Sequence, residues 1–590
     1  MAIESGKQAF EKILPDSIGS GHVEFLGAKD NVRSARVIFL LCGSLEDCHV
    51  PAGTLRTRSS DLCDQNWHGV PALAGPSLAV GFEQCGAMIN IATRINPAIA
   101  SAVSDTIARL DGRHLIDGAL VGPATGATLD VMDPATLQPI GKTPAGNAED
   151  VALAVRAATQ AYPGWSATPA RERGRAIAKA AGQIGANSEI ITTVLALETG
   201  KAIRTECRGE VATAIDILTL HAGLASELKG ETLPFHPSML TFTIREPLGV
   251  VAAILPWNVP LVLMMLKIAP ALVAGNTVVV KASEEAPFAT IECARIIAEL
   301  LPRGVLNVVS GTGRDCGMPL VVHPDVAKVT FTGSSEVGET IYQAAARKII
   351  PVSLELGGKS PMIVYPDADM PRAITGAVAG MRFTRQGQSC TASSRIYVHS
   401  SCFDAFVLGL RDVVARLKIG DPLDEATDIG TIVSAKQKSR IERYVAIAQQ
   451  DPAARLFACG SLPTESFLKD GNFVQPVIIT GVAEDGRLMR EEIFGPVVCI
   501  QPWDDEDDVL RRANDSDFGL AATVWTRDLR TALRATQRLD AGYVQVNQTL
   551  TIQPNLSYGG FKKSGLGKEA SLEAMLEHFT RKKTVVVDMQ

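Results

Sequence analysis

Short apolar runs alternate with longer segments of helical periodicity in the middle of the chain. Residues 249–254 and 276–281 are almost continuously apolar and have the length of strands. Each is followed by apolar residues at three- and four-residue spacing, as are the shorter runs 306–310 and 328–332. Apolar strands joined by helices indicate a parallel sheet covered on both faces. Ligands bind such a sheet at the carboxyl ends of its strands, so we expect the chemistry in the loops that follow these runs.

Two further regions show a regular pattern. Upstream, residues 115–121 and 128–132 read as hairpin strands with glycine turns, and residues 148–162 and 170–197 read as helices. Downstream, residues 360–578 alternate again and predict a second α/β domain. Its strand-like runs are 395–398, 477–480, 497–501, 523–525 and 542–546.

Two segments with strong β character lie outside these blocks. Residues 227–247 and 584–588 are rich in Thr, Val, Ile and Phe but have little core of their own. Exposed β edges pair readily with another subunit. We therefore expect a homodimer or a homotetramer.

The first 110 residues differ from the rest, because most of them lack a sustained periodicity. Three interpretations compete: a small extra domain, a disordered extension, or upstream sequence translated from the wrong start. We favour the last two. Residues 89–110 read as an ordinary helical lead-in, and Met88 is a candidate start.

The composition excludes several classes of protein. A formal net charge of -7 and a pI near 5.8 argue against a nucleic-acid partner. The eleven cysteines are scattered without CxxC pairs, which favours reduced thiols in a cytoplasmic protein and argues against a metal site. The chain opens without the long apolar stretch of a secretory signal. Residues 249–280 are apolar but are interrupted by prolines, so we expect no membrane span.

Three loop residues are candidates for chemistry. Asn258 follows an apolar strand between Pro256 and Pro260, where its amide could donate to an oxyanion; alternatively, it satisfies loop backbone. Glu355 ends an apolar strand, where burial would suit it as a general base, or it pairs with Lys359 or an arginine. Cys390 follows a glycine turn and is either a nucleophile or a buried structural cysteine.

Glycine-rich turns and a charged strand end suggest a nucleotide. The turn at Gly333-Ser334, and a second one at 311–317, could meet a pyrophosphate with backbone amides, or each could be a plain tight turn. Lys281 and Glu284 stand three residues apart at a strand end. The carboxylate could bind ribose hydroxyls, or the pair could cap the next helix.

Motifs that carry a family resemblance occur in order along the chain. They are Pro256-Trp257-Asn258, Lys281-Ala282-Ser283-Glu284, Phe331-Thr332-Gly333-Ser334, Leu354-Glu355-Leu356-Gly357-Gly358-Lys359, Gly387-Gln388-Ser389-Cys390 and Glu491-Glu492-Ile493-Phe494-Gly495-Pro496. From residue 114 to 590 the chain resembles the NAD(P)-dependent aldehyde dehydrogenase superfamily, non-acylating type.

The resemblance implies an α/β fold with two parallel-sheet domains and a β flap. The parts are a Rossmann-like NAD-binding domain (111–228 and 248–358), an α/β catalytic domain (359–577), oligomerisation segments (229–247 and 578–590) and an N-terminal extension (1–110).

The resemblance also implies catalytic roles. Cys390 would attack an aldehyde carbonyl to give a thiohemiacetal and then a thioester. Asn258 and the Cys390 backbone amide would form the oxyanion hole, with Lys267 as a supporting residue near Asn258. Glu355 would activate the water that hydrolyses the thioester to the carboxylic acid.

The cofactor implied is NAD, with NADP less favoured because Glu284 would repel a 2′-phosphate. Lys281 and Glu284 would take the adenosine ribose, Ser334 the pyrophosphate, and Glu492 the nicotinamide ribose. Phe494 would pack beside the nicotinamide ring. The other cofactor positions implied are Pro256, Trp257, Gly313, Gly317, Phe331, Gly333 and Leu356.

The substrate tunnel is read from the same resemblance. Its implied lining is Val259, Val262, Leu263, Leu266, Ser389, Thr391 and Tyr558. This set is mostly apolar and has no aromatic cage for a quaternary amine, so we expect an uncharged, hydrophobic or aromatic aldehyde. Arg385 stands where many relatives carry Asn and either orients the loop or lies near a substrate, which keeps a semialdehyde dehydrogenase open.

Two other functions remain as alternatives. The first is a coenzyme A-acylating aldehyde dehydrogenase, which a water-activating Glu355 argues against. The second is a fold retained for binding without turnover, which the combination of Cys390, Asn258 and Glu355 argues against.

Overall fold

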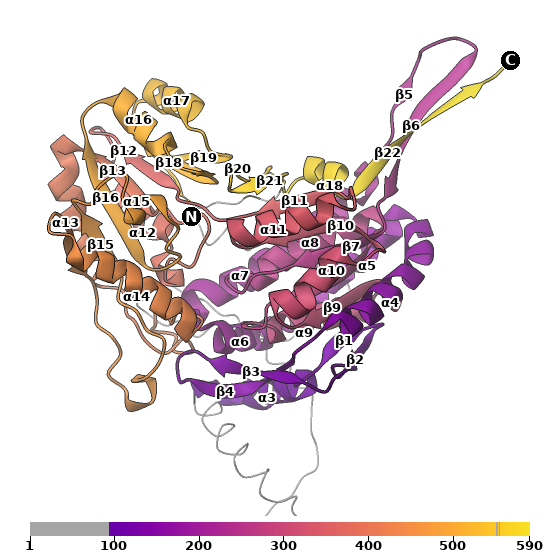
Figure 1. Ribbon diagram of the computed structural model, residues 1–590, viewed down its shortest axis with the longest axis horizontal. Helices are drawn as coiled ribbons and strands as arrows, with labels where there is room; N and C mark the ends of the chain where they lie inside the picture. Colours follow the sequence, from indigo (N-terminus) through magenta and orange to yellow (C-terminus); the bar gives the residue numbers. More distant parts are fainter. Residues whose placement is uncertain (1–93, 550–552, 554) are drawn as a thin grey trace, which may run out of the picture. The chain divides into compact units, whose positions relative to one another are not determined.

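The structure is a computed structural model that describes residues 94–549, 553 and 555–590. The predictions for residues 1–93 lie outside the described residues. The predicted α/β class with two parallel-containing sheets is confirmed (Figure 1).

Within the described residues, eight strands form the first sheet. Their order is β2 (Ala119–Val121), β1 (His114–Ile116), β9 (Leu306–Ser310), β8 (Thr277–Ala282), β7 (Val250–Ile254), β10 (Val326–Thr332), β11 (Val352–Glu355) and β21 (Gly565–Leu566). The five strands from β9 to β11 are parallel, and the strands at both ends are antiparallel. The sheet thus includes β21, which comes from the segment that we had assigned to the catalytic domain.

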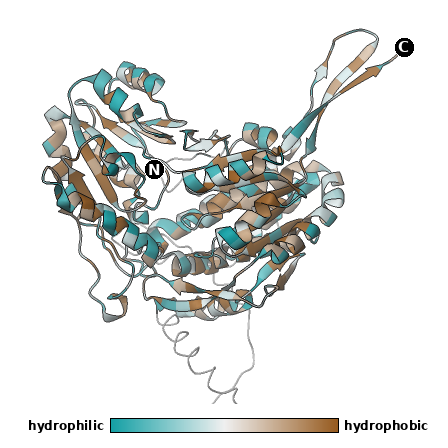
Figure 2. Cartoon of the chain, in the orientation of Figure 1, coloured by the Kyte–Doolittle hydropathy of each residue, from teal (hydrophilic) through white to brown (hydrophobic). Residues whose placement is uncertain are grey.

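Alternating side chains of this sheet enter two separate cores. Val250 and Ala252 of β7 face one core, and Val251 and Ala253 face the other. The helices that cover the sheet are α3 (Pro97–Leu110), α4 (Ala148–Ala167), α5 (Ala170–Ala186), α6 (Ser188–Thr199), α7 (Arg208–Gly223), α8 (Pro260–Ala274), α9 (Phe288–Ala298), α10 (Met318–Val322) and α11 (Ser335–Ala346). Burial on both faces explains why the strands are continuously apolar (Figure 2).

The helix α3 lies inside the segment that we had assigned to an N-terminal extension. Its buried face is formed by Val103, Ile107 and Leu110, which pack in the core on α6 and α9. An apolar face at helical spacing needs a partner surface, and the first domain supplies it. The folded part of the chain therefore begins upstream of the predicted boundary at residue 110.

Seven described strands form the second sheet. Their order is β14 (Arg455–Ala458), β15 (Val477–Thr480), β16 (Val497–Trp503), β13 (Arg395–His399), β12 (Pro361–Val364), β18 (Ala521–Trp525) and β19 (Tyr543–Val546), all parallel except β14. The accompanying helices are α12 (Met370–Met381), α13 (Phe403–Val414), α14 (Ala435–Gln450), α15 (Arg487–Arg490), α16 (Glu506–Asn514) and α17 (Leu529–Arg538). The helix α18 (Leu572–His578) packs instead on α8 of the first domain.

Smaller sheets complete the described part of the chain. β22 (Thr580–Asp588), β6 (Met239–Pro247) and β5 (Thr232–Leu233) form an antiparallel sheet that stands apart from the covering helices (Figure 1). Its outer strand exposes Val586 and Val587. The pairs β3 (Thr128–Asp133) with β4 (Gln138–Pro144) and β17 (Phe518–Gly519) with β20 (Phe561–Lys562) are two-stranded. Among the described helices, none has the length and apolarity that crossing a membrane requires.

Candidate active site

Two loops that are distant in sequence meet at Asn258 and Cys390. The first runs from the end of β7 to α8, which begins with Pro260 at its first position. The second follows α12 and turns through Gln386 and Gly387, both with positive φ. A Cβ on Gly387 would lie 2.1 Å from the backbone oxygen of Gly495, so the turn requires glycine. The amide Nδ2 of Asn258 donates to the backbone oxygen of Gln388 at 3.1 Å, which places it beside the cysteine.

The Cys390 side chain packs against the apolar core and also faces polar groups. Its Sγ is 3.8 Å from the Tyr558 hydroxyl. Burial, and then the nearby carboxylate of Glu492, raise the pKa of Cys390 to about 11, against the opposing effects of Tyr558 and Arg385. The thiol is therefore protonated at neutral pH and must lose a proton before it can act as a nucleophile.

Glu355 ends β11 with its carboxyl group buried. Its Oε2 has no hydrogen-bond partner among the described residues. Burial, and then the neighbouring carboxylate of Glu569, raise the pKa of Glu355 well above its ordinary value, and Lys267 and Lys568 oppose the shift. The alternative pairing with Lys359 is not formed, because the Lys359 Nζ also lacks a described partner.

Lys267 and Glu569 form a buried ion pair. The Lys267 Nζ lies 2.6 Å from Glu569 Oε1, which also accepts a hydrogen bond from the Thr330 hydroxyl at 3.3 Å. Lys267, which we expected as a supporting residue near Asn258, pairs with Glu569, and both charges act on Glu355. The sequence reasoning missed Glu569, because a single glutamate in a glycine-rich stretch carries no pattern of its own.

The adenosine side of the predicted cofactor site lies at the carboxyl ends of neighbouring strands. Lys281 Nζ pairs with Glu284 Oε2 at 2.7 Å, with the glutamate about one third exposed (34%). Ser334 caps α11, because its hydroxyl accepts from the Val337 amide at 3.4 Å. The strands β8 and β10 that deliver these residues flank β7, so the groups share one edge of the sheet.

The remaining predicted cofactor residues continue along the same edge. Glu492 accepts a hydrogen bond from the Gly358 amide at 3.0 Å, and burial raises its pKa to about 7. Phe494 packs edge-on against Trp257, which follows Pro256, with ring centroids 5.4 Å apart. Others in the set are Phe331 beside Gly333, Leu356 against Gly338 of α11, and Gly313 and Gly317 in a π-helical turn.

The predicted substrate residues come from α8 and from both flanks of Cys390. Val259, Val262, Leu263 and Leu266 recur at three- and four-residue spacing at the start of α8. Ser389 and Thr391 join their hydroxyls at 3.1 Å. Thr391 and Tyr558 together line a cavity of about 10 Å³, and Tyr558 stacks edge-on against Tyr543. The lining is thus apolar with a few hydroxyl groups.

Arg385 is held by an acid from the first domain. Its Nε donates to Glu206 at 2.7 Å, and both side chains are largely buried. Its Nε and Nη2 both face this carboxylate, which fixes the guanidinium and offsets its charge.

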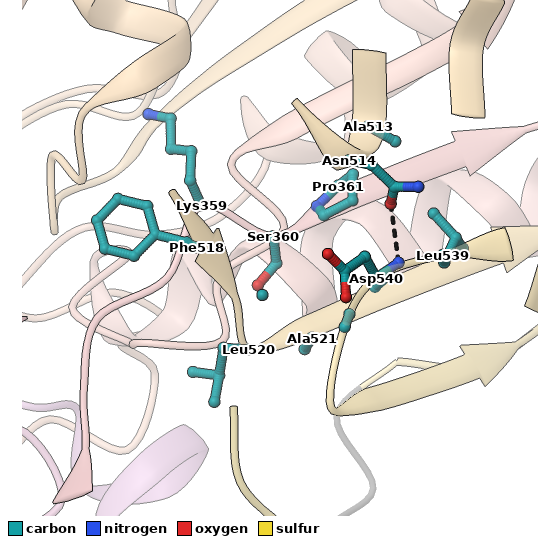
Figure 3. Close-up of a pocket in the computed structure, with 13 residues that line it drawn as sticks. Lys359, Ser360, Pro361, Ala513, Asn514, Phe518, Leu520, Ala521, Leu539 and Asp540 are labelled. Carbon is teal, nitrogen blue, oxygen red and sulfur yellow. Dashed lines mark hydrogen bonds between the residues drawn. The ribbon is translucent and has the colours of Figure 1, made fainter. Parts of the chain in front are cut away.

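A further pocket lies outside the predicted site. It occupies about 10 Å³ between Lys359, Ser360 and the segments 513–522 and 539–541, and the Asp540 amide donates to Asn514 beside it (Figure 3). This volume holds about one water molecule. None of the predicted site residues lines it.

Comparison with known proteins agrees with this arrangement. The model of the aldehyde dehydrogenase family matches residues 121–585. A hydroxyisobutyraldehyde dehydrogenase from Mycolicibacterium austroafricanum is 38% identical over 492 residues, which are 83% of this chain and 96% of the relative.

Solved structures are also similar. The betaine aldehyde dehydrogenase of Staphylococcus aureus in complex with NAD⁺ matches with a TM-score of 0.80 at 34% identity, covering 83% of this chain and 97% of that one. An NAD⁺ complex of an aldehyde dehydrogenase from Bacillus cereus matches with a TM-score of 0.79 at 33% identity, covering 82% and 98%. Fold, site and relatives agree: the chain belongs to the aldehyde dehydrogenase family.

Proposed function

We propose that the protein oxidises an uncharged aldehyde to its carboxylic acid with NAD, using Cys390 as the nucleophile. One observation carries the proposal. The Asn258 amide is bonded to the backbone two residues before Cys390, and the charge of the buried Glu355 carboxyl group reaches the Cys390 thiol.

The first step is the attack of the Cys390 sulfur on the aldehyde carbonyl carbon. The thiol proton leaves to Glu355 through water, and a C–S bond forms while the carbonyl π bond opens. The negative charge then falls on the carbonyl oxygen, where the Asn258 amide and the Cys390 backbone amide donate hydrogen bonds. Both donors are fixed before the reaction, so little reorganisation is needed.

The residues at the sheet edge fit a dinucleotide. Glu284, which is partly exposed at the end of β8, suits two ribose hydroxyls and would repel a 2′-phosphate, which favours NAD over NADP. Glu492 is oriented by the Gly358 amide and suits the second ribose. When bound, NAD supplies the acceptor for the hydride that leaves the former aldehyde carbon.

The second half-reaction releases the acid. Glu355 first releases the proton of the first step to solvent and then takes a proton from water, whose oxygen bonds to the acyl carbon. The C–S bond breaks with its electron pair returning to the Cys390 sulfur, which is protonated again. Burial raises the pKa of the Glu355 carboxyl group, which makes its carboxylate a stronger base than that of an exposed glutamate. The same reasoning disfavours transfer of the acyl group to coenzyme A.

The substrate class follows from the lining. The apolar start of α8 and the hydroxyls of Ser389 and Thr391 suit a small or aromatic aldehyde without charge. The bond from Arg385 to Glu206 argues against a semialdehyde held by that arginine. A relative that is named for hydroxyisobutyraldehyde supports a small aldehyde.

We also propose a cytoplasmic homodimer or homotetramer. The seven described cysteines are all free thiols, which suits a reducing compartment. The exposed edge of β22 suits pairing with a second subunit.

A panel of aldehydes tests the function directly. NADH formation is followed with propanal, benzaldehyde, betaine aldehyde and succinic semialdehyde, each with and without coenzyme A. We expect turnover of propanal or benzaldehyde without coenzyme A. A strict coenzyme A requirement, a strong preference for succinic semialdehyde, or no NADH with any aldehyde would overturn the proposal.

A further inference from the structure

Residues 201–210, which include the connection after α6 and the first turn of α7, hold three buried charges. Lys201, Glu206 and Glu210 are each less than 5% exposed, at 1%, 4% and 3%. Lys201 and Glu210 flank the π-helical turn Ile203–Cys207 and pair with each other, and Glu206 lies within the turn. Buried charges are costly unless surrounding groups compensate them, so their partners indicate what this segment holds in place.

Two of these charges hold the Asn258 turn. The Lys201 Nζ donates to the backbone oxygen of Asn258 at 2.8 Å. The Glu210 Oε1 accepts from the Leu261 amide at 2.9 Å, which is one of the donors left unpaired at the start of α8. The Lys201–Glu210 pair therefore holds the Asn258 turn at two points, the Asn258 backbone oxygen and the Leu261 amide.

The third charge holds the Cys390 loop. Glu206 accepts from the Arg385 guanidinium at 2.7 Å and from the Thr384 hydroxyl. The loop is then built on Arg385, because the Gln388 amide donates to the Arg385 backbone oxygen at 3.0 Å. Gln388 is also the residue whose backbone oxygen receives the Asn258 side chain. Hydrogen bonds thus connect residues 201–210 to the Asn258 turn, the Asn258 side chain to the Cys390 loop, and the Cys390 loop back to residues 201–210.

A second guanidinium makes Glu206 more important. The charge of Arg385 acts on Arg382, so the two guanidinium groups lie close together. The Nε of Arg382 has no hydrogen-bond partner among the described residues. The charges of both arginines reach Glu206. Without this carboxylate, two buried guanidinium groups would repel each other beneath the nucleophile loop.

We propose that Arg385 and Glu206 are positioning residues that keep Cys390 in register with Asn258, by fixing the nucleophile loop to the segment that holds the Asn258 turn. This inference rests on the proposed function. It assigns Arg385 to loop orientation and not to substrate binding.

The test compares Arg385→Met, Arg385→Lys and Glu206→Gln with Arg204→Met as the matched control. Arg204 lies in the same π-helical turn as Glu206 but binds Asp428 and the backbone of Glu425 and Thr427 at the surface.

With propanal and NAD⁺, we expect Arg385→Met to lower kcat by about 10- to 100-fold, since small displacements of reacting groups have effects of that size. The KM for propanal should change less than about threefold, because no substrate contact is lost. Arg385→Lys should recover part of the lost kcat, and Arg204→Met should stay within about twofold of the wild type.

Hydrogen–deuterium exchange provides a readout that does not need turnover. Arg385→Met should speed exchange in both loops, at 386–391 and at 255–261, whereas Arg204→Met should speed neither. An unchanged kcat would overturn the proposal, as would faster exchange at 386–391 without faster exchange at 255–261. A variant that differs from the wild type only by a higher KM for succinic semialdehyde would also overturn it. If the wild type oxidises no aldehyde, the proposed function fails, and the exchange comparison still decides the positioning role. If Arg385→Met does not fold, Arg385→Lys and Thr384→Val test the same contact by both readouts.

Discussion

Burial sets the acid–base chemistry of Cys390 and Glu355. Both groups favour their neutral forms, the thiol with its pKa raised to about 11 and the carboxyl group with its pKa raised well above the usual range. The Glu355 carboxyl group must therefore lose its own proton to solvent before it can accept the proton of the Cys390 thiol. Activity should therefore increase as the pH rises from 6 toward 9.

Glu492 offers a direct test of the charge that faces the thiol. Its pKa is about 7, so it is ionised at pH 8 and largely neutral at pH 6. Because its negative charge raises the pKa of Cys390, Glu492→Gln should speed alkylation of the thiol by iodoacetamide at pH 8. The rate at pH 6 should change little. Equal rates for both proteins at pH 8 would contradict this electrostatic account.

Glu355 should control the second half-reaction. Glu355→Gln keeps the size of the side chain but removes the base, so we expect a loss of about 10²- to 10⁴-fold in steady-state kcat. An initial burst of NADH should remain in stopped-flow experiments, because another route for the thiol proton needs to act only once per enzyme. Unchanged steady-state turnover would exclude Glu355 as the base.

The sequence predicted single residues best where a motif and a strand end coincide. Asn258 and Glu355 were identified in this way, and Cys390 by a motif that follows a glycine turn. The structure brings Asn258 and the Cys390 loop together. The partners of these residues were not predictable. Glu206, Glu210 and Glu569 lie far from them along the chain, and only the folded backbone makes them neighbours.

At the scale of elements, the turn after β11 links the base to the nucleophile. A Cβ on Gly358 would lie 2.4 Å from the backbone oxygen of Cys390. Gly358→Ala should therefore push the two loops apart, with a loss of stability of about 1–3 kcal/mol and a loss of activity of about 10-fold or more.

A matched control exists on α5. A Cβ on Gly182 meets nothing within 4 Å, and this residue is helical and exposed. Gly182→Ala should stabilise the protein by about 0.5–1 kcal/mol without affecting activity. Thermal unfolding measures the change in stability, and NADH formation measures the change in activity. Equal activities for Gly358→Ala and Gly182→Ala would contradict the claim that a Cβ at residue 358 displaces the Cys390 loop.

The strands and helices were more predictable than their boundaries. Apolar runs located β7 and β8 because both faces of the sheet are buried. The predicted helix over 170–197 divides at Asn187 into α5 and α6, a break that apolar spacing does not reveal. The short strand β21 was missed, because its two residues carry no pattern and pairing with β11 alone defines it.

At the scale of the whole molecule, the β5–β6–β22 sheet is the proposed contact between subunits. Val586 of β22 is 60% exposed, in a strand that has little core of its own. Val586→Asp should weaken subunit association and lower the mass measured by light scattering after gel filtration, since it places a charge on an apolar edge. An unchanged mass would place the interface elsewhere. Thr584→Ser, on the same strand, serves as the control.

Trapping the acyl intermediate tests the central claim most directly. Glu355→Gln is mixed with benzaldehyde and NAD⁺, quenched in acid and digested for mass spectrometry. The account predicts a benzoyl group on the peptide that contains Cys390, absent without NAD⁺ and absent from the other ten cysteines. NADH formation without an acyl group on Cys390, or an acyl group on a different cysteine, would contradict it.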